Sequence, residues 1–264
     1  MTVLKDIAYG GHERQRLDLC LPSCDTHGLI LFIHGGAWIA GDKCGNEDEL
    51  QLWGGRGYAA AAMNYHYLSP EYHMDTLLCD ITAALAKIKS VAAENGFGLT
   101  GVLLTGTSAG GHLSLLYAYS MAETAPIRPA CVIDYCGPTL LTDKGLLYDT
   151  PRNYPPVQQW IDIYSWLTGT DFSEDNMEKI LPELERYSPV CHITPLSAPT
   201  VICHGQKDDV VPFSNAVALR DRLESCGVEY VFLPMPQAGH GLEQKEIYEE
   251  SKMLFGIYAE RFLR

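Results

Sequence analysis

The chain has 264 residues, 47% hydrophobic and 20% charged, a balance typical of a folded globular protein that excludes intrinsic disorder and a collagen-like repeat. Nineteen Lys and Arg against 33 Asp and Glu give a formal net charge of −14, which argues against nucleic-acid partners and against binding to an anionic membrane surface. No apolar run approaches the roughly 18 residues of a membrane span, and residues 1–10 lack the basic and apolar pattern of a signal peptide.

The nine cysteines are the next constraint on the class of protein. None forms a C-x-x-C pair, so a zinc ribbon or a thioredoxin-type motif is disfavoured. Several lie in apolar surroundings, such as Cys131 and Cys203, where a reduced cysteine packs as a small hydrophobic residue. We therefore expect a cytoplasmic protein with reduced thiols. A secreted form with a few disulfides is the alternative.

The first half of the chain alternates strands with one long helix. Strands are predicted at 3–9 and 14–21, and the period-two alternation of the second is typical of a sheet edge that faces water on one side. The continuous apolar run at 28–33 predicts a central parallel strand. Residues 57–63 predict a short buried strand, although their alanines favour helix by propensity. Apolar residues at helical spacing over 74–95 predict a helix that ends at an Asn-Gly pair.

The second half of the chain continues this alternation. Its predicted strands are at 102–105, 130–135, 199–204 and 228–233, and its predicted helices are at 111–121, 213–226 and 242–261. Strands that alternate with helices predict an α/β fold with a mostly parallel sheet, of about eight strands, covered by helices on both faces. We expect a single domain over residues 1–264.

Residues 138–190 interrupt this rhythm after the sixth strand. The segment holds six prolines and six tyrosines and tryptophans, and it is longer than an ordinary connection. We expect an insertion with short helices of its own. It is either a surface excursion whose aromatic side chains pack onto the sheet or a cap over a pocket, and the two are compatible.

The turn after residues 102–105 carries the first chemical signal. It reads Gly106-Thr-Ser-Ala-Gly110, a G-x-S-x-G pattern that lies between an apolar strand and a helical segment. In this context the glycines permit a sharp turn that exposes Ser108, and the following helix directs its free N–H groups at the site. Ser108 is therefore the predicted nucleophile.

A serine hydroxyl needs a base, and in a fold of this kind the chain order is serine, acid, histidine. His240 is the predicted base, because it lies between small residues in a loop that follows a strand. His204 also follows a strand, but it precedes the candidate acids. Asp208 is the preferred acid and Asp209 the alternative; the carboxylate would hold the imidazole in the required tautomer.

A place for the oxyanion is predicted where His34-Gly-Gly-Ala-Trp38 follows the apolar strand. Glycines let backbone N–H groups approach a tetrahedral intermediate closely. The expected donors are the N–H groups of Gly36 or Ala37, together with that of Ala109. Trp38 is expected to pack as a wedge that fixes this loop.

These motifs resemble the α/β-hydrolase family, specifically the short serine esterases related to hormone-sensitive lipase, acetyl-xylan and feruloyl esterases, and kynurenine formamidase. The matching residues are His34-Gly-Gly-Ala-Trp38, Gly106-Thr-Ser-Ala-Gly-Gly-His112, Asp134-Tyr-Cys-Gly-Pro138, Tyr187-Ser-Pro189, His204-Gly-Gln-Lys-Asp208 with Val211-Pro212, and Gly239-His-Gly241. The resemblance spans nearly the whole chain, and its H-G-x-x-D motif implies Asp208 as the acid. One departure is Ala37, where lipase-like members have a third glycine; the backbone N–H is retained, but the pocket wall changes.

The expected function is that of a serine carboxylesterase acting on small to medium carboxylic esters, with acetyl or feruloyl esters of plant polysaccharide as candidates. No organic cofactor and no metal is implied, and the expected partner is a small-molecule ester. A monomer and a homodimer are equally compatible with the composition.

Two alternatives remain open. The H-G-G-x-W form also resembles kynurenine formamidase, which would make the protein an arylformamidase. A non-catalytic ligand-binding homologue is the alternative from another class, although such proteins typically lose a triad member and all three positions are filled here. A peptidase is disfavoured, because the chain has no room for the propeller domain of serine oligopeptidases with this fold.

Overall fold

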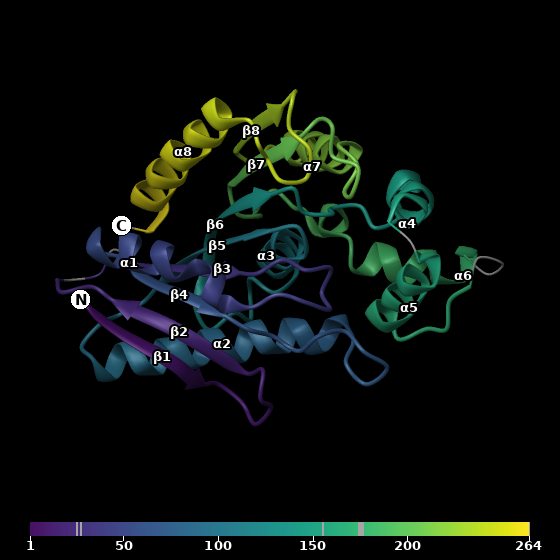
Figure 1. The fold of residues 1–264 in the computed structure, drawn as a ribbon. Coiled ribbons are helices and arrows are strands. Elements are labelled where there is room, and N and C mark those ends of the chain that lie inside the picture. The colour runs from purple at the N-terminus through teal and green to yellow at the C-terminus, as the bar shows by residue number, and fades with distance from the viewer. Residues whose placement is uncertain (25, 27, 155, 174–176, 264) are drawn as a thin grey trace.

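A computed structural model describes residues 1–24, 26, 28–154, 156–173 and 177–263. One sheet has the strand order β1-β2-β4-β3-β5-β6-β7-β8 (Figure 1). The strands are β1 (Thr2–Ala8), β2 (Arg16–Leu21), β3 (Leu29–Ile33), β4 (Ala59–Met63), β5 (Gly101–Thr107), β6 (Arg128–Tyr135), β7 (Thr200–Gly205) and β8 (Tyr230–Met235). The pairs β1/β2 and β2/β4 are antiparallel, and every later pair is parallel. The predicted α/β fold with about eight strands is confirmed.

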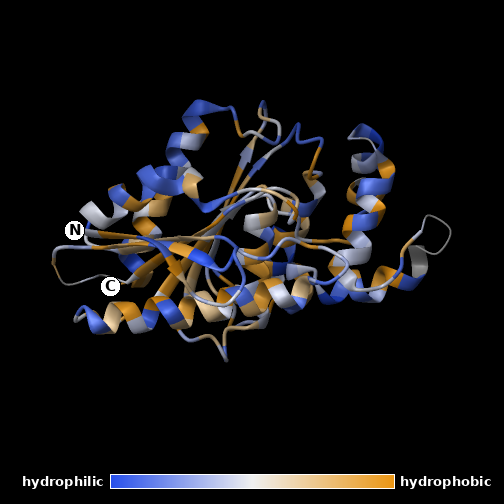
Figure 2. Cartoon of the chain, turned by 60° about the horizontal axis from the view of Figure 1, so that its bottom comes forward, coloured by the Kyte–Doolittle hydropathy of each residue, from blue (hydrophilic) through white to orange (hydrophobic). Residues whose placement is uncertain are grey.

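The central strands are apolar because helices cover both faces of the sheet. Every residue of β3 and β4 is buried, and the strands are the most hydrophobic part of the ribbon in Figure 2. The Ala-rich segment at β4 forms a strand, as predicted, because it pairs with β2 on one side and β3 on the other. Tertiary pairing here overrides the helical propensity of alanine.

The helices form two layers around the sheet (Figure 1). Residues of α2, α3 and α7 share one buried apolar cluster, and residues of α1 and α8 share the other. The long helices are α1 (Glu47–Gly55), α2 (Met74–Glu94), α3 (Ala109–Ser120), α5 (Val157–Thr168), α6 (Met177–Arg186), α7 (Ser214–Ser225) and α8 (Lys245–Leu263). The shorter ones are η1 (Lys43–Asn46), η2 (Gly145–Asp149), α4 (Thr150–Asn153) and η4 (Pro189–His192).

One expectation about the sheet was wrong. The alternation in β2 predicted an edge strand facing water, but β2 lies between β1 and β4 and only its first residue is not fully buried. Its polar residue, Asp18, is buried against the ammonium of Lys43, at 2.9 Å. Asp6 reaches the same ammonium at 2.8 Å. The charge at position 18 is therefore paired inside the protein rather than solvated.

The insertion at 138–190 contains helices of its own, as expected. η2, α4, α5 and α6 all fall within it and extend to one side of the sheet in Figure 1. Tyr164 of α5 is almost fully buried, and its hydroxyl donates to the carbonyl of Leu146 at 3.0 Å. Tyr164 therefore contributes to packing, whereas Tyr148 and Tyr154 of the same insertion are exposed.

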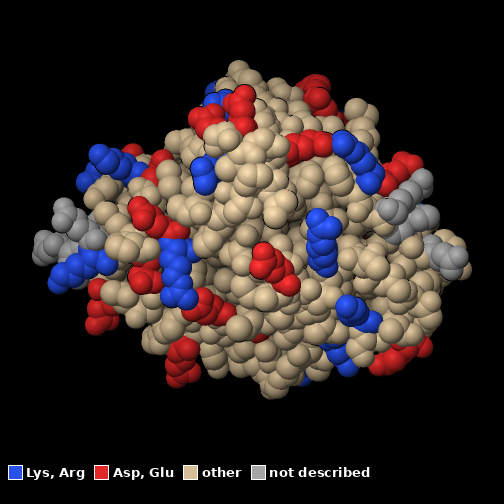
Figure 3. All heavy atoms as spheres, turned by 180° about the vertical axis from the view of Figure 1, so that it is seen from behind, with Lys and Arg blue, Asp and Glu red and all other residues tan. Residues whose placement is uncertain are grey.

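No helix within the described part of the chain is both long and apolar enough to cross a membrane. On the face seen in Figure 3, basic and acidic side chains are scattered among one another rather than gathered by sign.

Candidate active site

The site begins at a strained turn between β5 and α3. Ser108 has φ 57° and ψ −121°, a positive φ that is uncommon for a residue with a side chain. Its backbone N–H donates to the carbonyl of Tyr135 at 2.8 Å, which ties the turn to the end of β6. Strain of this kind persists only where the surrounding structure over-determines it, and it is common at functional sites.

Position 110 requires glycine because the backbone of α3 closely approaches the end of β3 there. A Cβ there would lie 2.0 Å from the carbonyl oxygen of Ile33, which closes β3. Another backbone oxygen, that of His34, would be 2.8 Å away. The first turn of α3 therefore rests directly on the start of the predicted oxyanion loop, and this contact fixes Ser108 relative to that loop.

The predicted oxyanion loop follows β3 and has left-handed backbone geometry over three consecutive residues. The φ angles are +113° at Gly36, +48° at Ala37 and +61° at Trp38. Two N–H groups, those of Ile39 and Ala40, donate to the carbonyl of Gly36 at 3.0 and 2.9 Å and close a tight turn. The loop is thereby held in a conformation that an extended chain would not adopt.

Trp38 is buried and fixes this loop, as expected. Its indole N–H donates to Nδ1 of His112 at 3.2 Å, and Nε2 of His112 then donates to the carbonyl of Tyr187 at 2.8 Å. Burial lowers the pKa of His112 to about 4, against the opposing effect of the Tyr187 bond. His112 therefore stays neutral and links the oxyanion loop to the last residues of the insertion.

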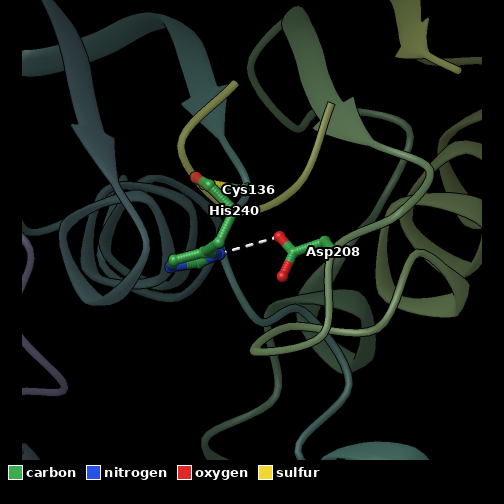
Figure 4. Close-up of side chains that lie close together, drawn as sticks. All are labelled: Cys136, Asp208 and His240. Carbon is green, nitrogen blue, oxygen red and sulfur yellow. Dashed lines mark hydrogen bonds and ion pairs between the residues drawn. The ribbon is translucent and has the colours of Figure 1, made fainter. Parts of the chain in front are cut away.

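The predicted acid and base are hydrogen-bonded to each other (Figure 4). Nδ1 of His240 lies 2.7 Å from Oδ2 of Asp208. The Asp208 carboxylate is fully buried, whereas the His240 ring is 24% exposed. The alternative acid, Asp209, is exposed and accepts a hydrogen bond from the hydroxyl of Tyr154. The geometry therefore favours Asp208 as the partner of the histidine.

Asp208 is ionised because it is surrounded by donors. Its Oδ1 accepts the backbone N–H groups of Val210 and Val211 at 2.9 and 2.8 Å. Burial alone would raise the pKa of Asp208, but bonds from His204 and His240 outweigh it and bring the pKa to about 2. A carboxylate held in this way orients an imidazole and stabilises its cationic form.

Among the hydrogen bonds of the described residues, none joins the Ser108 hydroxyl to His240. Such bonds are often long in enzymes without substrate and tighten when substrate binds. The two residues are linked through Cys136, whose Sγ lies 3.5 Å from the backbone carbonyl of His240. The residue before Cys136, Tyr135, accepts the Ser108 N–H described above.

Cys136, Asp208 and His240 also offer three potential metal ligands, whose atoms lie within 4.8 Å of one another. Metal binding requires a thiolate, but burial raises the pKa of the Cys136 thiol well above its usual value. The imidazole and the carboxylate are already bonded to each other. The arrangement suits a hydrogen-bonded pair, and we assign no metal to it.

Ser108 opens into a narrow cavity of about 30 Å³. The oxyanion loop, the start of α3, the insertion and the loop after Asp208 each contribute to its wall. The lining residues are Ala37, Trp38, Ser108, Ala109, Pro138, Leu146, Trp160, Tyr164, Val210 and Val211. Ala37 and Ala109 therefore face the nucleophile together, whereas Gly36, the other expected donor, is not among the lining residues.

A much larger cleft, about 1240 Å³, lies between α1 and α8. Its lining residues include His240 and Gly35 as well as the aromatic residues Trp53 and Phe255. Ser108 is not among its lining residues. The predicted nucleophile therefore lines the narrow cavity, whereas the predicted base lines this larger cleft.

Sequence reasoning missed Asp134 of β6 as a feature of the site. It is fully buried, its Oδ1 accepts the N–H of Gly137 at 3.1 Å, and its Oδ2 has no partner among the described residues. Burial raises the pKa of Asp134 to about 7, against the opposing charge of His204. The sequence signal was present in the Asp134-Tyr-Cys-Gly-Pro138 motif, but the motif does not indicate burial.

The raised pKa of Asp134 predicts a pH-dependent stability. The unfolded carboxyl titrates at about 4, so between pH 4 and 7 the folded state holds a proton that the unfolded state has lost. The free energy of unfolding should therefore fall as pH rises through this window. In Asp134→Asn this component is absent, so wild type should lose stability relative to the variant from pH 4 to 7, with no further change above. Urea unfolding of both proteins measures it; a constant difference would contradict the prediction.

The strand order, the strained serine turn and the His–Asp pair at the carboxyl ends of the strands define an α/β-hydrolase. The chain belongs to the BD-FAE family, whose model matches residues 17–223. The resemblance to α/β-hydrolase esterases is thereby confirmed.

Three curated relatives are similar over most of this chain. It is 30% identical over 250 residues to the probable carboxylic ester hydrolase LipM of Mycobacterium tuberculosis, covering 88% of this chain and 55% of that one. Identity is 24% to the esterase LipC of the same organism, covering 90% and 59%. It is 26% to the isoprenylcysteine alpha-carbonyl methylesterase ICME of Arabidopsis thaliana, covering 86% and 54%. The chain thus spans a little over half the length of these relatives.

Solved structures share the fold at low sequence identity. A truncated carbohydrate esterase from gut microbiota superimposes with a TM-score of 0.77 at 20% identity, covering 99% of this chain and 97% of that one. An esterase of Thermogutta terrifontis, determined with butyrate bound, gives 0.72 at 23% identity, covering 96% and 91%. At this level of identity the comparison establishes the architecture.

Proposed function

We propose that this protein hydrolyses carboxylic esters through an acyl-enzyme intermediate on Ser108. The observation that carries the proposal is the 2.7 Å bond between His240 and the buried carboxylate of Asp208, together with the positive φ of Ser108 at the turn between β5 and α3. Family membership supports it, and so do the names of LipM and LipC, which describe ester hydrolysis.

The proposed reaction has two halves. Ser108 Oγ attacks the acyl carbon while Nε2 of His240 takes its proton, and Asp208 stabilises the resulting imidazolium through Nδ1. Collapse of the tetrahedral intermediate breaks the ester C–O bond, and His240 gives the proton to the departing alkoxide. Water then attacks the acyl group in the same way, releasing the acid and restoring the serine.

The backbone N–H groups of Ala37 and Ala109 are the proposed oxyanion donors. Both residues line the cavity that contains Ser108, and the first of them belongs to a loop fixed by the Trp38–His112 bond. Donors fixed before the reaction cost no reorganisation when charge develops, and each contributes about 3–4 kcal/mol to transition-state stability. Gly36 supports the turn rather than facing the oxyanion.

The narrow cavity favours a short acyl group. About 30 Å³ holds roughly two water-sized spheres, enough for the methyl of an acetyl group and too little for a feruloyl ring. The aromatic side chains of Trp38, Trp160 and Tyr164 enclose this space. We therefore propose acetyl and similarly short esters as the substrates, in preference to feruloyl esters.

Chain-length profiles test this proposal. Wild type should hydrolyse p-nitrophenyl acetate with a kcat/KM about 100-fold above that for octanoate, because each excess methylene must be left outside the pocket or force it open. Trp160→Ala removes part of the wall and should raise octanoate turnover about tenfold. Tyr148→Ala alters an exposed aromatic residue of the same insertion outside the cavity lining and should change neither value.

The formamidase alternative is tested in the same assay. A formyl group also fits the narrow cavity, so N-formylkynurenine is compared with p-nitrophenyl acetate. Preference for the formamide would replace the esterase proposal, and efficient octanoate hydrolysis by wild type would contradict the short-acyl proposal.

A further inference from the structure

A second histidine contacts the proposed catalytic acid. His204 is the penultimate residue of β7 and is fully buried. Its Nε2 lies 2.9 Å from the carbonyl of Val211, to which it donates, and 3.2 Å from Oδ2 of Asp208. Oδ2 therefore faces two imidazoles, one from His204 inside the protein and one from His240 at the site.

The environment of His204 leaves its other nitrogen unused. Nδ1 of His204 has no hydrogen-bond partner among the described residues, and neither does Oδ2 of Asp134 on the neighbouring strand β6. Both side chains are fully buried and interact electrostatically. Buried polar groups without partners are rare and call for an explanation.

Glycines at two neighbouring positions leave space for the carboxyl group of Asp134. A Cβ at Gly111 would lie 2.3 Å from Oδ1 of Asp134, and one at Gly137 would lie 2.5 Å away. Asp134 therefore fits directly beneath the first turn of α3, the helix that begins after Ser108. His204 contacts Asp208, which in turn is bonded to His240.

We infer that His204 is a positioning residue for Asp208, because its Nε2, fixed by the carbonyl of Val211, lies 3.2 Å from Oδ2 and restrains the carboxylate that orients His240. This inference rests on the proposed function of Asp208. Among the described residues no hydrogen bond joins Asp134 to His204, so the buried carboxyl group interacts with this histidine electrostatically.

The other titratable groups near this pair stay uncharged. Cys136 and Cys203 face Asp134 from the ends of β6 and β7, and Tyr119 faces it from α3. Burial raises the pKa of each of these three groups. None of these three groups therefore adds a charge near Asp134.

The test is a pH titration of His240 by NMR in protein carrying labelled histidine. In His204→Leu, Asp208 loses one donor and attracts the proton on His240 more strongly, so the pKa of His240 should rise by about half a pH unit or more. The acid limb of kcat/KM should move to higher pH by the same amount. We expect kcat to fall about tenfold with KM within twofold, because the acyl pocket is untouched.

Two amides of different length make the test specific. His204→Gln can place an N–H where Nε2 lies and should keep the wild-type titration. The asparagine side chain of His204→Asn is one methylene shorter than glutamine and cannot reach Asp208, so this variant should titrate as His204→Leu does. It therefore replaces His204→Leu in the test if the leucine variant fails to fold. A merely structural histidine would not separate glutamine from asparagine in the titration of another residue.

A buried His–Asp pair elsewhere in the chain is the matched control. His66 is bonded to Asp80 at 2.7 Å and both are buried. His66→Leu should lower thermal stability and leave the His240 titration unchanged. If His240 titrates alike in wild type, His204→Leu and His204→Asn, the inference is wrong whatever the activity. If wild type hydrolyses no ester while the titration shifts as expected, the proposed function fails and the positioning role stands.

Discussion

Ser108→Ala is expected to reduce hydrolysis of p-nitrophenyl acetate by a factor on the order of 10⁴ to 10⁶ without unfolding the protein. Residues of a triad act as a unit, so removal of the nucleophile leaves only the binding and oxyanion contributions. The hydroxyl makes no hydrogen bond with any other described residue, and alanine meets the same positive φ as serine. The melting temperature should therefore stay within about two degrees of wild type.

Fluorophosphonate labelling followed by intact mass measures the same event without a substrate. Wild type should gain a single adduct, and Ser108→Ala should gain none. Ser225→Ala is the matched control, because Ser225 is exposed at the end of α7 and bonds only local atoms; it should label and turn over as wild type does. If Ser108→Ala retains activity, Ser108 is not the nucleophile. If wild type is neither labelled nor active, the esterase proposal itself is contradicted.

The parts of the site that the sequence predicted are those specified by short runs of residues. The G-x-S-x-G turn, the glycines after β3 and the H-G-x-x-D spacing each depend on backbone geometry over five or six residues. Buried strands were recognisable for the same reason, since both faces of β3 and β4 are covered and their sequences are continuously apolar. Sequence patterns predict secondary structure and turns well where the local sequence and the tertiary environment favour the same conformation.

The features that the sequence did not predict correctly are not specified by short runs of residues. Each depends on a contact with a residue far away in the chain. β2 resembles an edge strand because Asp18 alternates with leucines, but pairing with β1 and the ammonium of Lys43, which follows β3 in the chain, make that position part of the interior. His204 could be ruled out as the base from chain order, but its bond to Asp208 depends on how the loop after β7 folds back. The narrowness of the Ser108 cavity depends on where Trp160 of the insertion packs.

Asp208→Asn should lower kcat by about 10⁴ with little change in KM, whereas Asp209→Asn should stay within about threefold of wild type. Both oxygens of Asp208 accept hydrogen bonds, two from backbone N–H groups and others from imidazoles. An asparagine keeps one acceptor and turns the other into a donor. That donor would face Nδ1 of His240 and force the tautomer whose Nε2 carries a hydrogen and cannot take the serine proton.

The variants Asp208→Asn and Asp209→Asn test two adjacent carboxylates that differ in their structural surroundings. Asp209 is exposed and bonds Tyr154 in the insertion, so its charge is screened by water and contributes little to the histidine. Steady-state kinetics on the acetate ester measure both variants, with circular dichroism to establish that each is folded. A large loss in Asp209→Asn with an active Asp208→Asn would reverse the assignment of the acid. A loss in both would mean that the loop after β7 acts as a unit, since Asp208 also anchors the N–H groups of the two residues that follow Asp209.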